Sequence, residues 1–496
     1  MTPPEPDDRR VLDGGASDLR RRAARGGSIV FAVQLVQQGL RLVLLAVMAR
    51  LLTPNDYGLL GMVLAFTALL ATFQDLGLSA ATVQRKDLTE AQLSAVFWLN
   101  VALGTAMALL FAASAPAVAW FYDEPTLVPV TVAVACGLLL ASLGTQSAAL
   151  LDRRMDFASV ALAEVFGLVA GGAAGIVGAL NGYGVFALVG QRLVQTAVTM
   201  SVYVLRARWR PGRPRWAAGV REMVGFGGYL TGFNILNYFT RNFDKVLLGK
   251  FWGTIELGLY TRSYMLMTLP IQLASWPLAR VLRPALSRLQ DDEVRFAEAS
   301  VSALHVLTWV SFPMAGGLAV LAEETIRLVY GEQWLAAVPV YRVLCIAGLL
   351  QTLLNVSGTF FVARGKAREF FRWGIFASTV TVVGFLPCIW YGGIGAAIGY
   401  SVVVYTTAPL LYAFIDRVIG IPIAAVWRTV VGPAVATGLM SALVWQLKAQ
   451  LPLDWNLVTR VGVLVLAGVV AYLLLTPVLA PAALREAVRT YRRATA

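Results

Sequence analysis

Cysteine and histidine are scarce in this 496-residue sequence, which contains three cysteines and a single histidine. Cys136, Cys345 and Cys388 lie inside apolar runs, and no two of them have the spacing of metal ligands or of a redox pair. The lone His305 argues against a histidine-ligated metal centre. The G-x-x-x-x-G-K-S/T motif of phosphate-binding loops is also absent. We therefore expect no metal, no cofactor and no ATP hydrolysis by this chain.

Charged residues are also few, at 14% of the chain against about 25% in soluble domains, whereas 58% of the residues are hydrophobic. The charges gather in short stretches between apolar runs of about 20 residues, the length at which a helix crosses a bilayer. Alternating segments of about ten residues, which are typical of outer-membrane barrels, are not seen. The sequence therefore predicts an all-α polytopic membrane protein.

The apolar runs predict about fourteen transmembrane helices, an even number that places both termini on one side of the membrane. Of the 41 lysines and arginines, about 30 fall on the tails and loops of that side and about four on the opposite loops. Basic loops face the cytoplasm and its anionic lipids, so the net charge of +13 indicates membrane lipid rather than nucleic acid as the partner. We expect a multi-pass protein of the bacterial inner membrane with both termini cytoplasmic.

The loops predicted on the far side of the membrane are short, and the longest, near residues 323–333, has about a dozen residues. Membrane glycosyltransferases and polysaccharide ligases usually need a sizeable extramembrane loop for their chemistry. We therefore expect that the protein is not an enzyme. The alternative from the class of enzymes is an integral-membrane polysaccharide polymerase or ligase.

A basic, proline-containing stretch at residues 206–221 predicts a cytoplasmic linker after the sixth span. The segments that follow the N-terminal tail and this linker align weakly at an offset of 200 residues. The matched pairs are Gly27 with Gly227, Arg41 with Arg241, Arg50 with Lys250, Asp56 with Glu256, and Gly58-Leu59 with Gly258-Leu259. Both copies begin in the cytoplasm, so they indicate parallel repeats with a substrate site between two halves.

Two stretches carry a family resemblance: ARLLTPNDYGLLGM from position 49 and NFDKVLLGKFWGTIELGLYTRSYMLMTLP from position 242. They resemble the polysaccharide exporters of the multidrug/oligosaccharidyl-lipid/polysaccharide (MOP) superfamily, in particular the Wzx-type flippases of lipopolysaccharide (O-antigen) and exopolysaccharide units. The resemblance implies a MATE-like arrangement of two six-helix lobes plus two helices. The predicted boundaries are 1–27 for a tail, 28–205 and 222–415 for the lobes, 206–221 for the linker, 416–478 for helices 13 and 14, and 479–496 for a second tail.

The resemblance also implies a function, which is alternating access between the lobes that moves an undecaprenyl-diphosphate-linked oligosaccharide to the periplasmic leaflet. Polysaccharide polymerase machinery is a further expected partner. Two alternatives from the same superfamily stay open. A multidrug antiporter would be expected to have carboxylates in its cavity, whereas the spans here carry more basic than acidic residues. A flippase for the peptidoglycan lipid precursor would also transport a diphosphate, so the charge of the cavity does not distinguish it from a polysaccharide flippase.

Ionisable residues inside the predicted spans are candidates for the site, because a charge at a helix centre costs about 2.5–3.5 kcal/mol and normally faces a cavity or a partner. Arg41, Arg241 and Arg262 are predicted to contact the substrate diphosphate, with Lys245 adding charge. Structural pairing of Asp244 with Arg241 and Lys245 is the alternative, and Arg262 could instead snorkel to the interface.

Polar residues near these cations complete the predicted site. Gln34 and Gln38 on the first span and Asn237 on the seventh are candidates for binding sugar hydroxyls. Hydrogen bonding between helices is the alternative for the two glutamines, and core packing is the alternative for Asn237. Asp75 and Asp244 are candidates for ion coupling or gating. Glu164 on the fifth span is expected to take part in packing.

Overall fold

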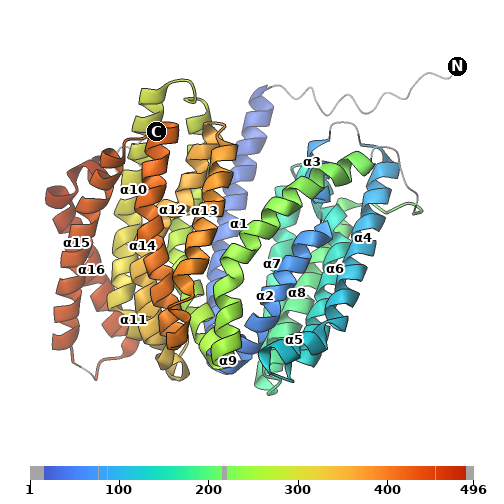
Figure 1. The fold of residues 1–496 in the computed structure, drawn as a ribbon, viewed down its shortest axis with the longest axis horizontal. Helices are drawn as coiled ribbons and strands as arrows, with labels where there is room; N and C mark the ends of the chain where they lie inside the picture. Colours follow the sequence, from blue (N-terminus) through green and yellow to red (C-terminus); the bar gives the residue numbers. More distant parts are fainter. Residues whose placement is uncertain (1–15, 76, 86–87, 215–219, 453, 487–496) are drawn as a thin grey trace. The chain divides into compact units, whose positions relative to one another are not determined.

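The computed structural model describes residues 16–75, 77–85, 88–214, 220–452 and 454–486. Within these ranges every regular element is helical, which confirms the all-α class (Figure 1). The first eight helices are α1 (Ala16–Leu51), α2 (Pro54–Asp75), α3 (Leu78–Gln84), α4 (Glu90–Ala113), α5 (Ala115–Tyr122), α6 (Leu127–Arg153), α7 (Phe157–Leu180) and α8 (Val185–Ala207). The remainder are α9 (Val220–Ser287), α10 (Glu293–Val320), α11 (Ala322–Val329), η1 (Glu332–Ala337), α12 (Val338–Ala363), α13 (Ala367–Phe385), η2 (Ile389–Tyr391), α14 (Gly392–Ile419), α15 (Ile423–Gln450) and α16 (Leu457–Leu479).

Nine helical segments in the described part of the chain are long and apolar enough to cross a membrane. They are α4, α6, α7, α8, α10, α15, α16, η1 with α12, and η2 with α14. A tenth crossing results if 36–51 and 54–67, which meet at a 119° bend, form one broken span. The chain is therefore a multi-pass membrane protein, while the number of fourteen crossings stays a prediction.

Two helix breaks occur at positions 200 residues apart. The first separates α1 from α2 at Thr53, whose backbone N–H and hydroxyl both donate to Asp56 Oδ2, at 2.9 and 2.7 Å. The second lies at Gly253 inside α9, where the backbone takes a φ of 76°. Glycine adopts this left-handed conformation at little cost, so the chain can break there and resume as a helix. Both breaks fall in the motifs that carried the family resemblance.

The described chain divides into two compact units, one within residues 1–52 and 66–235 and the other within 53–65 and 236–496. In the first unit α7 packs along α8, α6 packs between α4 and α8, and α1 packs on α7. Glycines make the approach of α1 possible: a Cβ at Gly172 would meet the Leu44 side chain, and one at Gly175 would meet Met48 at 3.1 Å. Small residues at helix contacts are the usual means of close packing in membranes.

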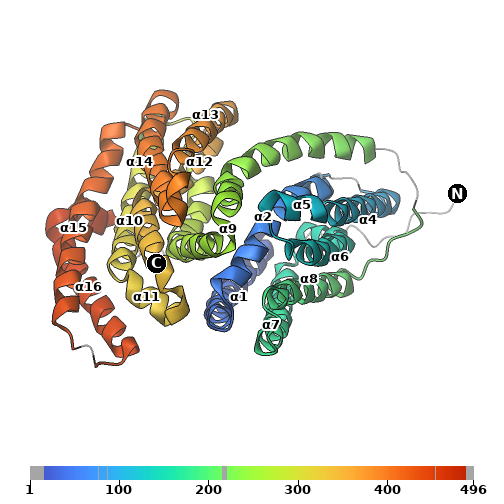
Figure 2. The same cartoon turned by 60° about the horizontal axis from the view of Figure 1, so that its bottom comes forward.

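The second unit is built on α10, α12, α14 and α15, which share an apolar core (Figure 2). Phe296, Phe360 and Phe361 are fully buried in it. Leucine, valine and isoleucine from the four helices fill the remaining space, as close-packed interiors require.

An arginine at the end of a long helix binds carbonyl groups in each unit. In the first unit Arg154 Nη1 donates to the carbonyl oxygen of Ala207, at the end of α8, over 2.7 Å. In the second, Arg364 Nη2 donates to the carbonyl oxygen of Ile419, at the end of α14, over 3.3 Å. The helices involved are α6 and α8 in one unit and α12 and α14 in the other, which is the correspondence that an internal repeat predicts.

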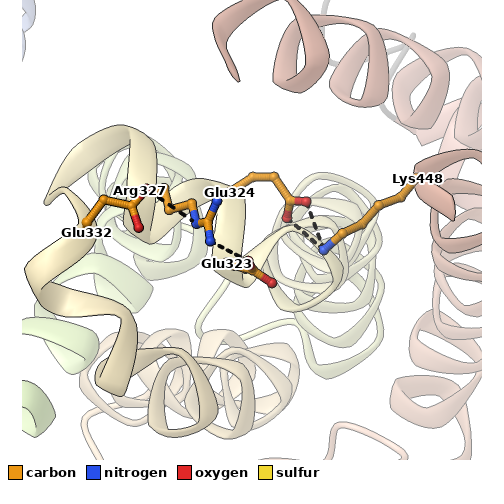
Figure 3. Close-up of polar contacts among 5 residues, drawn as sticks. All are labelled: Glu323, Glu324, Arg327, Glu332 and Lys448. Atoms are coloured by element: carbon orange, nitrogen blue, oxygen red, sulfur yellow. Dashed lines mark hydrogen bonds and ion pairs between the residues drawn. The ribbon is translucent and has the colours of Figure 1, made fainter. Parts of the chain in front are cut away.

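A buried ion pair joins α15 to α11 in the second unit (Figure 3). Lys448 Nζ lies 2.8 and 2.9 Å from the two carboxylate oxygens of Glu324. The neighbouring Glu323 and Glu332 both pair with Arg327, at 3.2 and 3.7 Å. The Lys448 contact therefore fixes the C-terminal end of α15 to the short helix that follows α10.

Candidate functional site

Arg41 projects from α1 in the first unit, and its orientation follows from the packing of α1 on α7. Gln37, one turn earlier, is buried and donates from Nε2 to the Ala161 carbonyl oxygen over 3.1 Å. Arg41 Nη2 lies 4.0 Å from Glu164 Oε2 on the same α7 helix. The predicted sugar-binding residues differ in exposure, since Gln34 is exposed and Gln38 is half-buried. The structure thus brings Gln37, Arg41 and Glu164 together along the contact between α1 and α7.

The pairing of Arg41 with Glu164 is weak. The two side chains are 51% and 42% exposed, and the separation is at the upper limit for an ion pair. Exposed pairs of this kind contribute about 0–1 kcal/mol. Arg41 is therefore oriented by Glu164 but keeps most of its capacity to bind another anion. Sequence spacing could not identify this partner, because the two residues are on different helices.

Asp244 is a buried acidic residue of the predicted site. Its Oδ2 accepts a hydrogen bond of 2.8 Å from the Tyr260 hydroxyl, and both residues belong to α9. Its Oδ1 is buried without a hydrogen-bond partner among the described residues. The adjacent Lys245 donates from Nζ to Asn242 Oδ1 over 3.1 Å and lies 5.9 Å from the centre of the Tyr264 ring. The side chains of Asp75, Asn237 and Arg241 lie outside the described part of the chain.

Arg262 lies on aromatic side chains. Its guanidinium carbon is 3.6 Å from the centre of the Tyr57 ring, close enough for a strong cation–π contact. The Tyr57 ring in turn meets Trp334 edge-on at 5.5 Å. The Tyr330 hydroxyl donates to the Arg262 carbonyl oxygen over 3.1 Å, and burial raises the pKa of Tyr330 above its ordinary value. The structure therefore adds an aromatic support for Arg262 that sequence reasoning did not identify.

The same part of the second unit contains a reciprocal contact between the two copies of the repeat. A Cβ at Gly58 would collide with the Thr254 carbonyl oxygen, and one at Gly258 would collide with the Pro54 carbonyl oxygen. Adding 200 to the numbers of one repeat copy turns one contact into the other, because position 58 corresponds to 258 and position 54 to 254. Thr254 also hydrogen-bonds to the Asn55 side chain. This symmetry of contacts supports the repeat that was inferred from a weak alignment.

Among the residues that the structure describes, no three His, Cys, Asp or Glu side chains gather in a way that could hold a metal ion.

The family is shown by a comparison with known proteins. A family model described as "Polysaccharide biosynthesis protein" matches residues 47–339. The chain belongs to this family. This match confirms the expected resemblance to polysaccharide biosynthesis proteins, and the apolar helices agree with a transmembrane protein.

Alignments with relatives cover most of this member of the polysaccharide biosynthesis family. The chain is 28% identical over 411 residues to the lipopolysaccharide biosynthesis protein WzxC of Escherichia coli (strain K12), and the alignment covers 81% of this chain and 82% of that protein. It is 25% identical over 343 residues to the succinoglycan biosynthesis transport protein ExoT of Rhizobium meliloti (strain 1021), covering 69% of each.

Solved structures show the fold. The lipid II flippase MurJ in an inward closed conformation matches with a TM-score of 0.72 at 13% identity, over 91% of this chain and 98% of that one. An inward-facing MATE family multidrug transporter of the MOP superfamily matches with a TM-score of 0.60 at 15% identity, over 77% of this chain and 95% of that one. At these identities the likeness supports the predicted MATE-like fold and no particular substrate.

Proposed function

We propose that this protein flips undecaprenyl-diphosphate-linked oligosaccharide units across the inner membrane for the synthesis of exopolysaccharide or lipopolysaccharide. The observation that carries the proposal is a half-exposed basic side chain, Arg41, on a predicted span of a chain from a polysaccharide biosynthesis family. An exposed charge on a spanning helix is too costly to face lipid, so it indicates an aqueous path. A cationic path suits an anionic lipid headgroup.

The diphosphate would be bound by Arg41, Arg241, Lys245 and Arg262. A guanidinium binds two phosphate oxygens at once through its planar fork of N–H groups, whereas Lys245 acts as a point charge. The weak Glu164 pairing supports this role for Arg41, because a doubly charged headgroup can displace a half-exposed carboxylate.

Further polar groups have proposed roles in the same path. Gln34, Gln38 and Asn237 would hydrogen-bond to sugar hydroxyls. Asp75 and Asp244 would couple an ion or gate the path, and the burial of the Asp244 carboxylate supports a coupling role. Alternating access would move the two lobes against each other about the 206–221 linker, with both termini in the cytoplasm.

The proposal is tested by polysaccharide export in a host from which the native exporter has been deleted. We expect Arg41→Ala and Arg241→Ala to abolish export while membrane insertion stays normal. Arg41→Lys and Arg241→Lys should retain partial activity, because lysine keeps the charge without the fork. Arg295→Ala is the matched control, since the Arg295 side chain is 74% exposed on the N-terminal turn of α10 and pairs with its neighbour Asp292.

Normal export by both alanine variants would refute the role of the arginines in diphosphate binding. If the wild-type chain instead restored growth to cells that lack their peptidoglycan-precursor flippase and did not restore export, the substrate would be the peptidoglycan lipid.

A further inference from the structure

Four polar side chains form a continuous hydrogen-bonded row across three helices of the second unit. The Tyr264 hydroxyl on α9 lies 3.3 Å from the Tyr400 hydroxyl on α14. Tyr400 donates to Gln351 Oε1 on α12 over 2.7 Å, and Gln351 Nε2 donates to Asn355 Oδ1 over 3.0 Å. We call these four residues the polar row.

Two members of the polar row lie in the middle of a candidate span rather than at its end. Gln351 and Asn355 are in the central turns of α12, which runs from Val338 to Ala363 within a membrane-spanning segment. Asn355 is exposed, and the other three members are half-buried. An amide facing hydrocarbon loses its hydrogen bonds to water at a cost of several kcal/mol. The exposed amide of Asn355 therefore favours water or a polar ligand over hydrocarbon.

The bonds within the row differ from those that tie helices together elsewhere in the unit. Tyr405 and Tyr412, also on α14, donate to backbone carbonyl groups of Ile346 and Leu353 on α12. The three bonds that define the polar row each join one side chain to another. Either partner of such a bond can rotate to present its polar group to a ligand, whereas in a bond to a backbone carbonyl only the tyrosine can move.

The chemistry of the row matches a carbohydrate. Phenol and amide groups are neutral and both donate and accept hydrogen bonds, as each sugar hydroxyl does. The Tyr264 and Tyr400 rings meet edge-on at 5.3 Å and add apolar surface for the C–H face of a sugar ring. Lys245 lies beside the Tyr264 end, so a positive charge precedes the neutral groups. A lipid-linked glycan has a matching order, because its negatively charged diphosphate is followed by neutral sugars.

We propose that the polar row binds hydroxyl groups of the transported glycan, with its diphosphate beside Lys245. The inference rests on the proposed function, and it assigns glycan recognition to α12 and α14. The row would then select among sugars, while the basic residues would select for the diphosphate.

The test compares two probes bound to the full-length protein in detergent: undecaprenyl diphosphate carrying one hexose, and undecaprenyl diphosphate alone. Dissociation constants are measured by microscale thermophoresis. We expect the wild type to bind the hexose-bearing lipid about three- to tenfold more tightly, as one or two extra hydrogen bonds predict. Gln351→Leu and Asn355→Leu should remove this preference without changing the affinity for undecaprenyl diphosphate.

Tyr405→Phe is the matched control, because it removes a hydroxyl that bonds the same two helices outside the row and should keep the preference for sugar. Tyr400→Phe is a milder variant that removes only the central hydroxyl, in case a leucine variant fails to fold. An unchanged preference in the row variants, or equal binding of both lipids by the wild type, would overturn the inference and leave the proposed function standing. Binding of neither lipid by the wild type would overturn the proposed function itself.

Discussion

The ion pair between Lys448 and Glu324 allows a quantitative test of how the C-terminal helices are held. The side chain of Glu324 is 6% exposed and that of Lys448 is 18% exposed, so both charges are largely removed from solvent. Two contacts of 2.8 and 2.9 Å join them, and Arg460 Nη2 donates to the Lys448 carbonyl oxygen over 3.1 Å. Replacing Lys448 by methionine keeps most of the apolar side chain and removes the ammonium group, with its charge and its hydrogen bond to Glu324.

The expected loss is large because Glu324 would stay buried without its counter-ion. Breaking a buried pair by removing one partner typically costs about 3–5 kcal/mol. Residual exposure of Lys448 places the expected cost of Lys448→Met at the lower end, at about 3 kcal/mol. The double variant Lys448→Met with Glu324→Gln removes both charges, so it should regain most of this loss.

The measurement is the free energy of unfolding in mixed detergent micelles for the wild type, both single variants and the double variant. A double-mutant cycle should give a coupling energy of about 2–3 kcal/mol. Arg295→Met is the control, because its pair with Asp292 is exposed and should contribute less than about 1 kcal/mol. Single variants as stable as the control, with additive effects in the cycle, would refute the reasoning.

Two further predictions concern the contact between the repeats. Gly58→Ala should destabilise the protein by about 1–3 kcal/mol, because the new methyl group meets a backbone carbonyl on α9, whereas Gly39→Ala has open space and should stabilise α1 by about 0.5–1 kcal/mol. Equal effects of the two changes on the free energy of unfolding would contradict the packing. Tyr57→Ala should cost about 2–3 kcal/mol by the same measurement, through loss of the Arg262 and Trp334 contacts, and Tyr57→Phe should cost much less because the ring remains. Equal losses for the two would show that the hydroxyl matters and the ring does not.

The fold was predictable from the sequence because apolar runs and charge asymmetry are local properties. The helices, the membrane character and the family follow from runs of about 20 residues and from two motifs. The repeat was visible as a few matched glycines and charges. The structure explains why Gly58 and Gly258 match, since each lies against the backbone of the other copy. The number of membrane crossings was harder to predict from the sequence. Spans that contain charges and breaks have a hydropathy close to that of helices lying at the membrane interface.

The partners of the site residues could not be predicted from the sequence in the same way. Glu164 meets Arg41 from another helix, and Tyr57 meets Arg262 across about 200 positions, so no spacing rule connects them. The polar row could not be predicted for the same reason, because its members come from three different helices. Residues within four positions of each other on one helix, such as Asn242 and Lys245, were the pairs that spacing could suggest.

The surroundings of Arg41 and Arg262 indicate different contributions to binding a diphosphate. Glu164 holds Arg41 by about 0–1 kcal/mol, less than the 1.5–3 kcal/mol typical of a hydrogen bond to a charged group, so a phosphate can replace that carboxylate. The contact of Arg262 with Tyr57 is worth about 0.5–2 kcal/mol and uses the face of the guanidinium. Phosphate binding uses the N–H groups at its edge, so the two interactions are compatible. Under the proposed function, Arg41 would therefore exchange one anion for another, while Arg262 would bind phosphate without leaving the ring that orients it.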